Sequence, residues 1–314
     1  MRQNIPSERA THARGAPPAR LLVAAAIGAL CLIWGTTWSV IQIGLEGIPP
    51  FTGVAVRFTI SGLLLLVLAR ARRIRLGATR RERILWVANG TLSFAVAYGV
   101  VYWAEQWVPS ALAAVLFALY PLFVAILAHF VLPDESLKLR EVVGVLIGFT
   151  GVAVIFSEDL SLLGGPQVAV GAVVMLLSPL ASAAGSVSVK RWGGDIHPFS
   201  ISALPMLVAA ATMAVPAVAF ERDLDITLDV RSVSALLYLA VAGSAVTFSL
   251  YFWLLSHLPA KRLALIAYVI PIVAVGIGVL RGEPLTSQTL AGSTCVVAGV
   301  ALAVQRWGGG RPNR

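Results

Sequence analysis

The chain is short of charge and of cysteine. Only 12% of its 314 residues are charged and 58% are hydrophobic, whereas a soluble domain carries about 25% charged residues. This composition excludes an ordinary soluble domain and indicates a membrane protein. The two cysteines, Cys31 and Cys295, both lie in apolar runs, which excludes a disulfide framework and a paired metal-ligand motif.

The sequence also lacks the motifs of several enzyme classes. It has no GxxxxGK[ST] phosphate-binding loop, no HExxH zinc motif and no GxSxG nucleophile motif. We therefore expect no catalytic residue, no metal site and no cofactor, and we expect the protein not to be an enzyme. Two alternatives stay open here: an integral-membrane enzyme, and a membrane scaffold that transports nothing.

Long apolar runs are what the chain has instead. Each is about 17–24 residues long, the length with which an α-helix crosses a bilayer, and none alternates like the strands of a membrane barrel. The predicted spans are 21–43, 51–70, 84–104, 109–132, 141–157, 168–189, 199–220, 232–255, 260–280 and 287–306. The expected fold class is therefore all-α and integral to the membrane, with ten transmembrane helices. The first span is too long for a signal peptide, so we expect it to be retained.

Positive charge indicates how the spans are oriented. With the amino terminus placed inside, 20 of the 24 lysines and arginines fall on the inner side, and only Arg222, Arg231 and Arg281 fall outside. Inner loops of membrane proteins carry such an excess, so both termini are predicted to be cytoplasmic. The same rule explains the net charge of +9 without nucleic acid as a partner.

The chain is an internal duplication. At an offset of 150 residues, YGVVYWAEQWVP (98–109) aligns with FSLYFWLLSHLP (248–259), and at an offset of 148, Pro50 aligns with Pro198. Each half has five spans, and because five is odd, the second half must be inverted in the membrane. Inverted repeats are typical of transporters with a solute site near the midplane. The predicted units are an inner tail (1–20), a first five-helix repeat (21–157), an outer linker (158–167), a second repeat (168–306) and an inner tail (307–314).

Several segments resemble one family. The chain is similar to the EamA family of the drug/metabolite transporter superfamily in IWGTTWSVIQIGLEGIPP (33–50), VRF (56–58), LAAVLFALYPLFVAILAHFVLPDESL (112–137), GVLIGFTGVAVIF (144–156) and GEPLTSQTLAGSTCVVAGVALAV (282–304). The resemblance extends over nearly the whole chain. It implies an inner-membrane transporter, often an exporter of amino acids, related metabolites or drugs, and it leaves the substrate open.

Aromatic residues recur about one helical turn apart in the spans. Trp34, Trp38 and Gln42 are spaced by four and share one face of the first span. Membrane tryptophans usually lie at the interface, but these two lie deeper, so we predict a solute cavity, with interfacial or packing roles as the alternative. Tyrosine hydroxyls inside a membrane need polar surroundings. The rest of the predicted cavity consists of Tyr98, Tyr120, Phe248 and Tyr268, with packing as the alternative for Phe248.

Two prolines occupy matching positions in the two halves. Pro121 and Pro271 lie in mid-span at the offset of 150, and a proline inside a helix removes a backbone hydrogen bond and kinks the helix. We predict a pair of hinges, with static kinks as the alternative.

One cation lies well inside a span. A charge such as that of Arg57 costs about 3 kcal/mol at the centre of a helix on insertion scales, and it is normally paired or faces a cavity. Glu46 and Glu105, at the outer ends of neighbouring spans, are the candidate partners. Snorkelling toward the interface, or a salt bridge between helices, is the alternative to a cavity-facing role.

Small residues form a stripe on each of two spans. Gly144 and Gly148 on the fifth span, and Gly292 and Gly299 on the tenth, allow close helix packing. These spans are predicted to pack together or at a dimer contact, which leaves a homodimer open.

These features together predict a secondary transporter that works by alternating access. Its partners would be a small organic solute and the lipid bilayer, in the inner membrane of a bacterium. No Asp or Glu lies at mid-membrane, and Glu105 and His129 are the nearest titratable groups. We therefore expect transport to follow the gradient of the solute, with weak coupling to protons or none.

Overall fold

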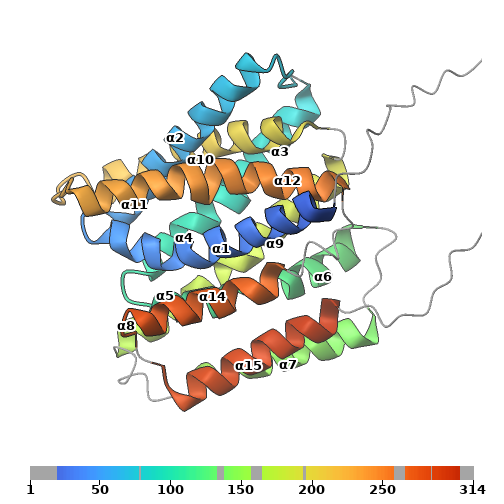
Figure 1. The fold of residues 1–314 in the computed structure, drawn as a ribbon, viewed down its shortest axis with the longest axis vertical. Coiled ribbons are helices and arrows are strands. Elements are labelled where there is room, and N and C mark those ends of the chain that lie inside the picture. The colour runs from blue at the N-terminus through green and yellow to red at the C-terminus, as the bar shows by residue number, and fades with distance from the viewer. Residues whose placement is uncertain are drawn as a thin grey trace, which may run out of the picture.

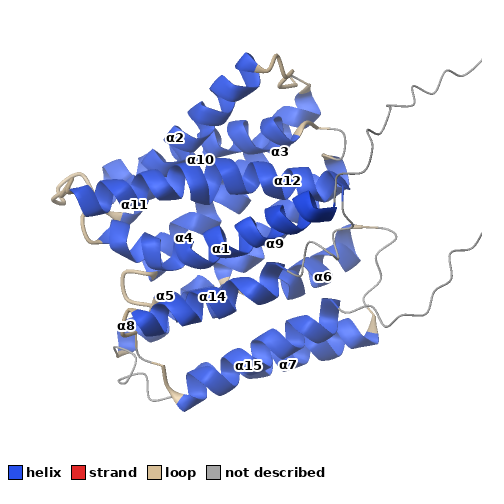
Figure 2. Cartoon of the chain, viewed as in Figure 1, coloured by secondary structure: helices blue, strands red, loops and turns tan. Residues whose placement is uncertain are grey.

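The computed structural model describes residues 20–77, 79–132, 138–156, 165–193, 196–257, 266–283 and 285–304. These residues form helices and turns, with no strand among them (Figure 2). Seven helical segments are long and apolar enough to cross a membrane, and Val269–Leu280 and Ser287–Leu302 are shorter apolar helices. The all-α membrane fold is confirmed.

The first repeat makes five helical passes. They are α1 (Arg20–Leu45); α2 (Pro50–Ala71); α3 (Arg80–Asn89) with η1 (Gly90–Val96) and α4 (Ala97–Ala104); α5 (Ser110–Phe117) with α6 (Tyr120–Val131); and α7 (Leu139–Phe156).

The second repeat makes five more passes. They are α8 (Pro166–Met175) with α9 (Leu177–Trp192); α10 (Pro198–Phe220); α11 (Val230–Ala240) with η3 (Val241–Val246) and α12 (Thr247–His257); α14 (Ile266–Leu280); and α15 (Ser287–Val304). The predicted spans agree with these bounds to within four residues. The predicted end of the fifth span, the predicted start of the ninth and the predicted end of the tenth lie outside the described residues.

Two segments of π-helix lie at matching positions in the two repeats. η1 ends at Val96 and η3 ends at Val246, so their ends coincide at the offset of 150 found in the sequence, and their starts, Gly90 and Val241, match to within one residue. η1 interrupts the third pass of the chain, and η3 interrupts the eighth. Each of these is the third pass of its repeat. π-Helical turns are rare and are found frequently at functional sites. Their repetition therefore indicates that the middle of the third and eighth passes is a candidate functional region.

Contacts between the repeats hold the bundle together. α2 packs along α10, and α7 packs along α15 as a pair at the lower edge of the view (Figure 1). A Cβ on Gly299 would lie 2.5 Å from the carbonyl oxygen of Gly144, and one on Gly151 would lie 2.5 Å from that of Gly292. The predicted packing of the fifth and tenth spans is therefore confirmed within one chain.

The outward surface of the bundle is apolar. Large side chains that are more than half exposed lie along several helices, among them Leu32, Val67, Leu146 and Val215. A soluble protein rarely exposes so much apolar surface in mid-helix, whereas lipid requires it because no water is present there. These side chains therefore indicate the faces that contact lipid.

One end of the bundle carries the short loops 46–49, 105–109 and 221–229 and residues 281–283, on the left of Figure 1, and we call it the outer end. There the backbone N–H of Thr227 donates to Gly47 at 2.8 Å, and the amide of Gln42 donates to the carbonyl oxygen of Val108 at 3.0 Å. This is the end predicted to be outside.

At the outer end, the second repeat caps a helix of the first. α2 follows Pro49 and has no side-chain cap of its own. The Glu221 carboxylate instead accepts from the backbone of Phe51 at 2.8 Å and of Thr52 at 2.7 Å. The first N–H groups of a helix lack partners and favour negative charge, so this contact ties α10 to α2.

The two predicted hinge prolines lie in different surroundings. The fourth pass is interrupted at Ala118 and Leu119, and Pro121 lies in the first turn of the helix that follows. α14 continues as a helix through Pro271. The helix is therefore broken just before Pro121 but continuous at Pro271. That either proline acts as a hinge stays a prediction.

Candidate solute site

Arg57 lies at the centre of the contact between α2 and η3. Its side chain is fully buried, with 0% exposure. The guanidinium donates to the Ser244 hydroxyl at 2.8 Å, to the Gly243 carbonyl at 3.2 Å and to the Tyr102 hydroxyl at 3.3 Å. The π-helical turn of the second repeat thus supplies two of the three acceptors for a cation of the first repeat.

The prediction of an acidic partner for Arg57 is wrong. Glu46 pairs instead with Arg231, with 3.0 Å between Oε2 and Nη1, and Glu105 accepts no hydrogen bond from a described residue. Within the described part of the chain, no carboxylate lies at ion-pair distance from Arg57. Neutral oxygens and aromatic rings surround this cation, so its positive charge is not cancelled locally.

An aromatic cluster adjoins Arg57. The guanidinium carbon lies 4.7 Å from the ring centroid of Tyr98, within the range of a cation–π contact. Edge contacts between rings then run from Tyr98 to Phe58 at 5.0 Å, and from Phe94 to Phe248 at 4.8 Å. The cluster consists of Trp34, Phe58, Phe94, Tyr98, Phe248 and Tyr251, from α1, α2, η1, α4 and α12.

Trp34 joins this cluster from α1. Its ring lies 5.5 Å from Phe248 and 5.6 Å from Tyr251. Three residues of the predicted cavity, Trp34, Tyr98 and Phe248, are therefore brought together by the fold. All three side chains are half-buried. They keep some exposed surface even though they lie between helices.

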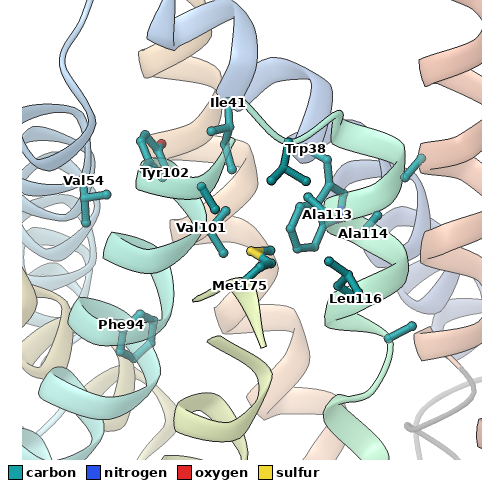
Figure 3. Packing of buried hydrophobic residues seen from close by; sticks show 14 of the residues in the cluster. Trp38, Ile41, Val54, Phe94, Val101, Tyr102, Ala113, Ala114, Leu116 and Met175 are labelled. Carbon is teal, nitrogen blue, oxygen red and sulfur yellow. The ribbon is translucent and has the colours of Figure 1, made fainter. Parts of the chain in front are cut away.

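A second group of rings lies beside the first. Trp38 is 5.4 Å from Phe117, which stacks on Tyr120 at 5.9 Å. The Tyr120 hydroxyl donates to Ser186 at 2.8 Å and shares a hydrogen bond with Tyr251. Tyr120 thus links the fourth, sixth and eighth passes. Figure 3 shows Trp38 facing Ala113 and Ala114 across the core.

Two indole N–H groups in these rings have no acceptor in the part of the chain that the structure describes. The Nε1 atoms of Trp34 and Trp38 are buried and find no hydrogen-bond acceptor among the described residues, and Trp38 as a whole is 7% exposed. A buried donor left without an acceptor costs about 1–3 kcal/mol. Such groups usually have a water or a ligand as partner, so these donors are suited to receive one.

Two members of the predicted cavity are not part of these clusters. The Gln42 amide donates to the carbonyl oxygen of Val108 at the outer end. The side chain of Tyr268 lies outside the described residues. The prediction that both line the cavity stays untested.

Sequence reasoning missed several residues of the site. Ser244 and Gly243 bind Arg57, and Ser186 binds Tyr120. Tyr102 follows Phe94 and Tyr98 on one stripe at a spacing of four, but its place near the outer end of the span is typical of an interfacial residue, whereas the structure buries it against Arg57. The small residues carry no comparable signal, because serine and glycine also serve helix packing throughout membrane proteins.

Comparison with known proteins decides the family. The model of the EamA-like transporter family matches residues 21–157 and 169–305. The chain belongs to this family. The two matched stretches are the two repeats, which confirms the resemblance seen in the sequence and places the chain among membrane transporters.

Individual EamA-like relatives are similar over most of their length. The uncharacterized inner membrane transporter YedA of Escherichia coli (strain K12) is 32% identical over 285 residues, which cover 90% of this chain and 90% of that protein. The uncharacterized transporter YvbV of Bacillus subtilis (strain 168) is 25% identical, covering 87% and 88%. A solved crystal structure with 21% identity has a TM-score of 0.66, covering 91% of this chain and 97% of that one; this likeness shows the fold alone.

Proposed function

We propose that this EamA-like protein is a secondary transporter that exports amino acids or related small metabolites by alternating access. The observation that carries the proposal is a pair of buried indole donors, those of Trp34 and Trp38, that have no acceptor among the described residues and lie in aromatic clusters next to a buried arginine. These residues lie on helices of both repeats, which supports the proposal because inverted-repeat transporters bind the solute between their repeats.

The chemistry of the clusters favours a solute with a carboxylate and an apolar body. Arg57 is fully buried, so it acts on a solute through its positive field, and low-dielectric surroundings strengthen that field. The indole N–H groups can donate to a carboxylate. The rings of Tyr98 and Phe248 can pack against an apolar side chain. An amino acid provides both parts.

The inner membrane of a bacterium is the proposed location, with both termini in the cytoplasm. The apolar outer surface and the relative named as an inner membrane transporter support the membrane, and the distribution of lysine and arginine supports the orientation. Thiol labelling of Asp229→Cys from the outside, and of Arg75→Cys from the inside only, is the expected result. Labelling of both from the same side would contradict the orientation.

Counterflow in proteoliposomes tests the function. Vesicles loaded with an unlabelled apolar amino acid should accumulate the labelled one, and its amide should compete about tenfold less well because it lacks the carboxylate. Equal competition by acid and amide would contradict the proposed recognition. The absence of any flux would favour the scaffold or the enzyme alternative. Export is tested in cells, where overproduction should lower the retained amino acid and a rise would contradict export.

A further inference from the structure

Side chains from both repeats close the outer end of the bundle. The hydroxyls of Ser39 on α1 and Ser110 on α5 lie 3.0 Å apart. Arg281 donates to the carbonyl of Ser39 at 2.8 Å, and the Glu283 carboxylate accepts from the backbone of Ala111 at 3.0 Å and from the Ser110 hydroxyl. We call these five residues the outer latch, because α1 and α5 belong to the first repeat and residues 281–283 to the second.

Glu105 lies near this latch and has no hydrogen-bond partner among the described residues. It ends α4, in the turn before α5, and is 3% exposed. Both of its carboxylate oxygens are buried and accept no hydrogen bond from a described residue. Two other carboxylates at the outer end do have hydrogen-bond donors. Glu221 accepts from the backbone of Phe51, and Glu283 accepts from the backbone of Ala111.

Among the described residues, three charged side chains act on Glu105. Glu283 repels a negative charge there, while Arg57 and Arg281 attract it, but neither arginine forms an ion pair with it in the described structure. Of the described elements packed against α4, helices α8 and η1 carry no charged residue. The charged residues of the others are Arg20 at the start of α1, Arg57 and Arg70 on α2, and Lys190 and Arg191 in the last turn of α9. α4 itself adds the hydroxyls of Tyr98 and Tyr102. An ionised carboxylate buried without a partner costs several kcal/mol, so such a group takes up a proton instead.

We propose that Glu105 is a proton-binding site linked to the outer latch. It carries a proton while the latch is closed and releases it to external water when the outer end opens. The step breaks the carboxyl O–H bond, and the proton passes to water while the electron pair stays on the carboxylate.

The direction of the pH effect follows from linkage. The closed conformation binds the proton more tightly than the open one, so an acidic exterior favours the closed outer end and an alkaline exterior favours opening. This inference goes beyond the proposed function, because it concerns the empty protein and does not depend on which solute is carried. It also differs from the sequence-based expectation of weak proton coupling or none.

Thiol labelling from the outside measures the opening. Ala114→Cys, introduced where Cys31 and Cys295 are replaced by alanine, places a probe one turn below Ala111 at a buried position. Its labelling by a membrane-impermeant reagent should rise with external pH faster in the native Glu105 background than in Glu105→Gln, by up to about tenfold per pH unit for one proton. Comparing rates within one cysteine position removes the pH dependence of the thiol itself.

The matched control is Glu46→Gln, an exposed carboxylate paired with Arg231, which should keep the native pH dependence. Identical pH dependence in native protein and Glu105→Gln would overturn the proposal. So would equal loss of pH dependence in Glu46→Gln.

Infrared spectroscopy of the native protein gives a second measurement that does not need Glu105→Gln to fold. At neutral pH the carbonyl stretching band of a protonated carboxylic acid should be present, and Glu105→Asp should shift it. Absence of this band would overturn the proposal. Neither measurement uses a solute, so a failure of counterflow would not contradict proton binding at Glu105. Likewise, a failure of these two measurements would not contradict the proposed transport function.

Discussion

The contact between α2 and η3 and the contact between α10 and η1 are the same interface made twice. At the offset of 148 that aligns Pro50 with Pro198, Arg57 corresponds to Pro205. In the first interface Arg57 donates to Ser244 and Gly243. In the second, a Cβ on Gly90 would lie 2.7 Å from the carbonyl oxygen of Pro205, so backbone packs directly on backbone.

The difference shows what duplication preserved and what it did not. Both repeats keep the π-helical turn and the helix that packs on it, while the cation exists in one repeat only. The aromatic rings next to Arg57 come chiefly from the first repeat, with Phe248 and Tyr251 from the second. A symmetric scaffold therefore holds one asymmetric site, not two equal ones.

Removing the cation should have the largest effect. Arg57→Ala leaves the Ser244 hydroxyl and the Gly243 carbonyl without their donor and opens a cavity, so we expect a loss of about 3–5 kcal/mol of unfolding free energy. Pro205→Ala, at the matching position, should change it by less than about 1 kcal/mol. Unfolding in mild detergent measures both, and equal losses would mean that the two interfaces are equivalent.

The α7–α15 contact is a further interface between the repeats, and glycines line it on both sides. Gly299→Ala would place a Cβ 2.5 Å from the Gly144 carbonyl oxygen, and such overpacking costs about 1–3 kcal/mol. Gly276→Ala, where nothing lies within 4 Å, should be neutral or should stabilise by up to about 1 kcal/mol. If both variants unfold at the same midpoint, the close glycine packing does not hold these helices together.

The outer end should give the smallest effects. Glu221→Gln weakens a charged cap on the first turn of α2 and should cost about 1 kcal/mol. Glu46→Gln removes an exposed ion pair with Arg231, and such pairs contribute about 0–1 kcal/mol, so we expect a change near zero. The same unfolding measurement compares them, and a larger loss for Glu46→Gln would contradict the assignment of Glu221 as the tie between repeats.

The spans and the repeat could be predicted from the sequence because the membrane imposes them on composition. Apolar length sets each helix, and the loop charges set its direction. The π-helical turns could not be predicted, since η1 and η3 have no shared residue pattern that distinguishes them from α-helix. The partners of Arg57 were missed for a different reason. Opposite charge was the expected signal, whereas a carbonyl, two hydroxyls and aromatic rings surround this cation.

The most direct test of the solute site removes the two indole N–H groups and keeps an aromatic ring at each position. In Trp34→Phe/Trp38→Phe a benzene ring replaces each indole, so counterflow affinity for the amino acid should fall about tenfold, which corresponds to about 1.4 kcal/mol. Each lost donor is buried without an acceptor among the described residues, which offsets part of the packing lost with the smaller ring, so the free energy of unfolding should fall by no more than in the control variant. The matched control is Trp103→Phe/Trp107→Phe, a pair 4.9 Å apart near the outer end, which should leave affinity unchanged. Unchanged affinity in the first variant, or an equal fall in both, would contradict the account.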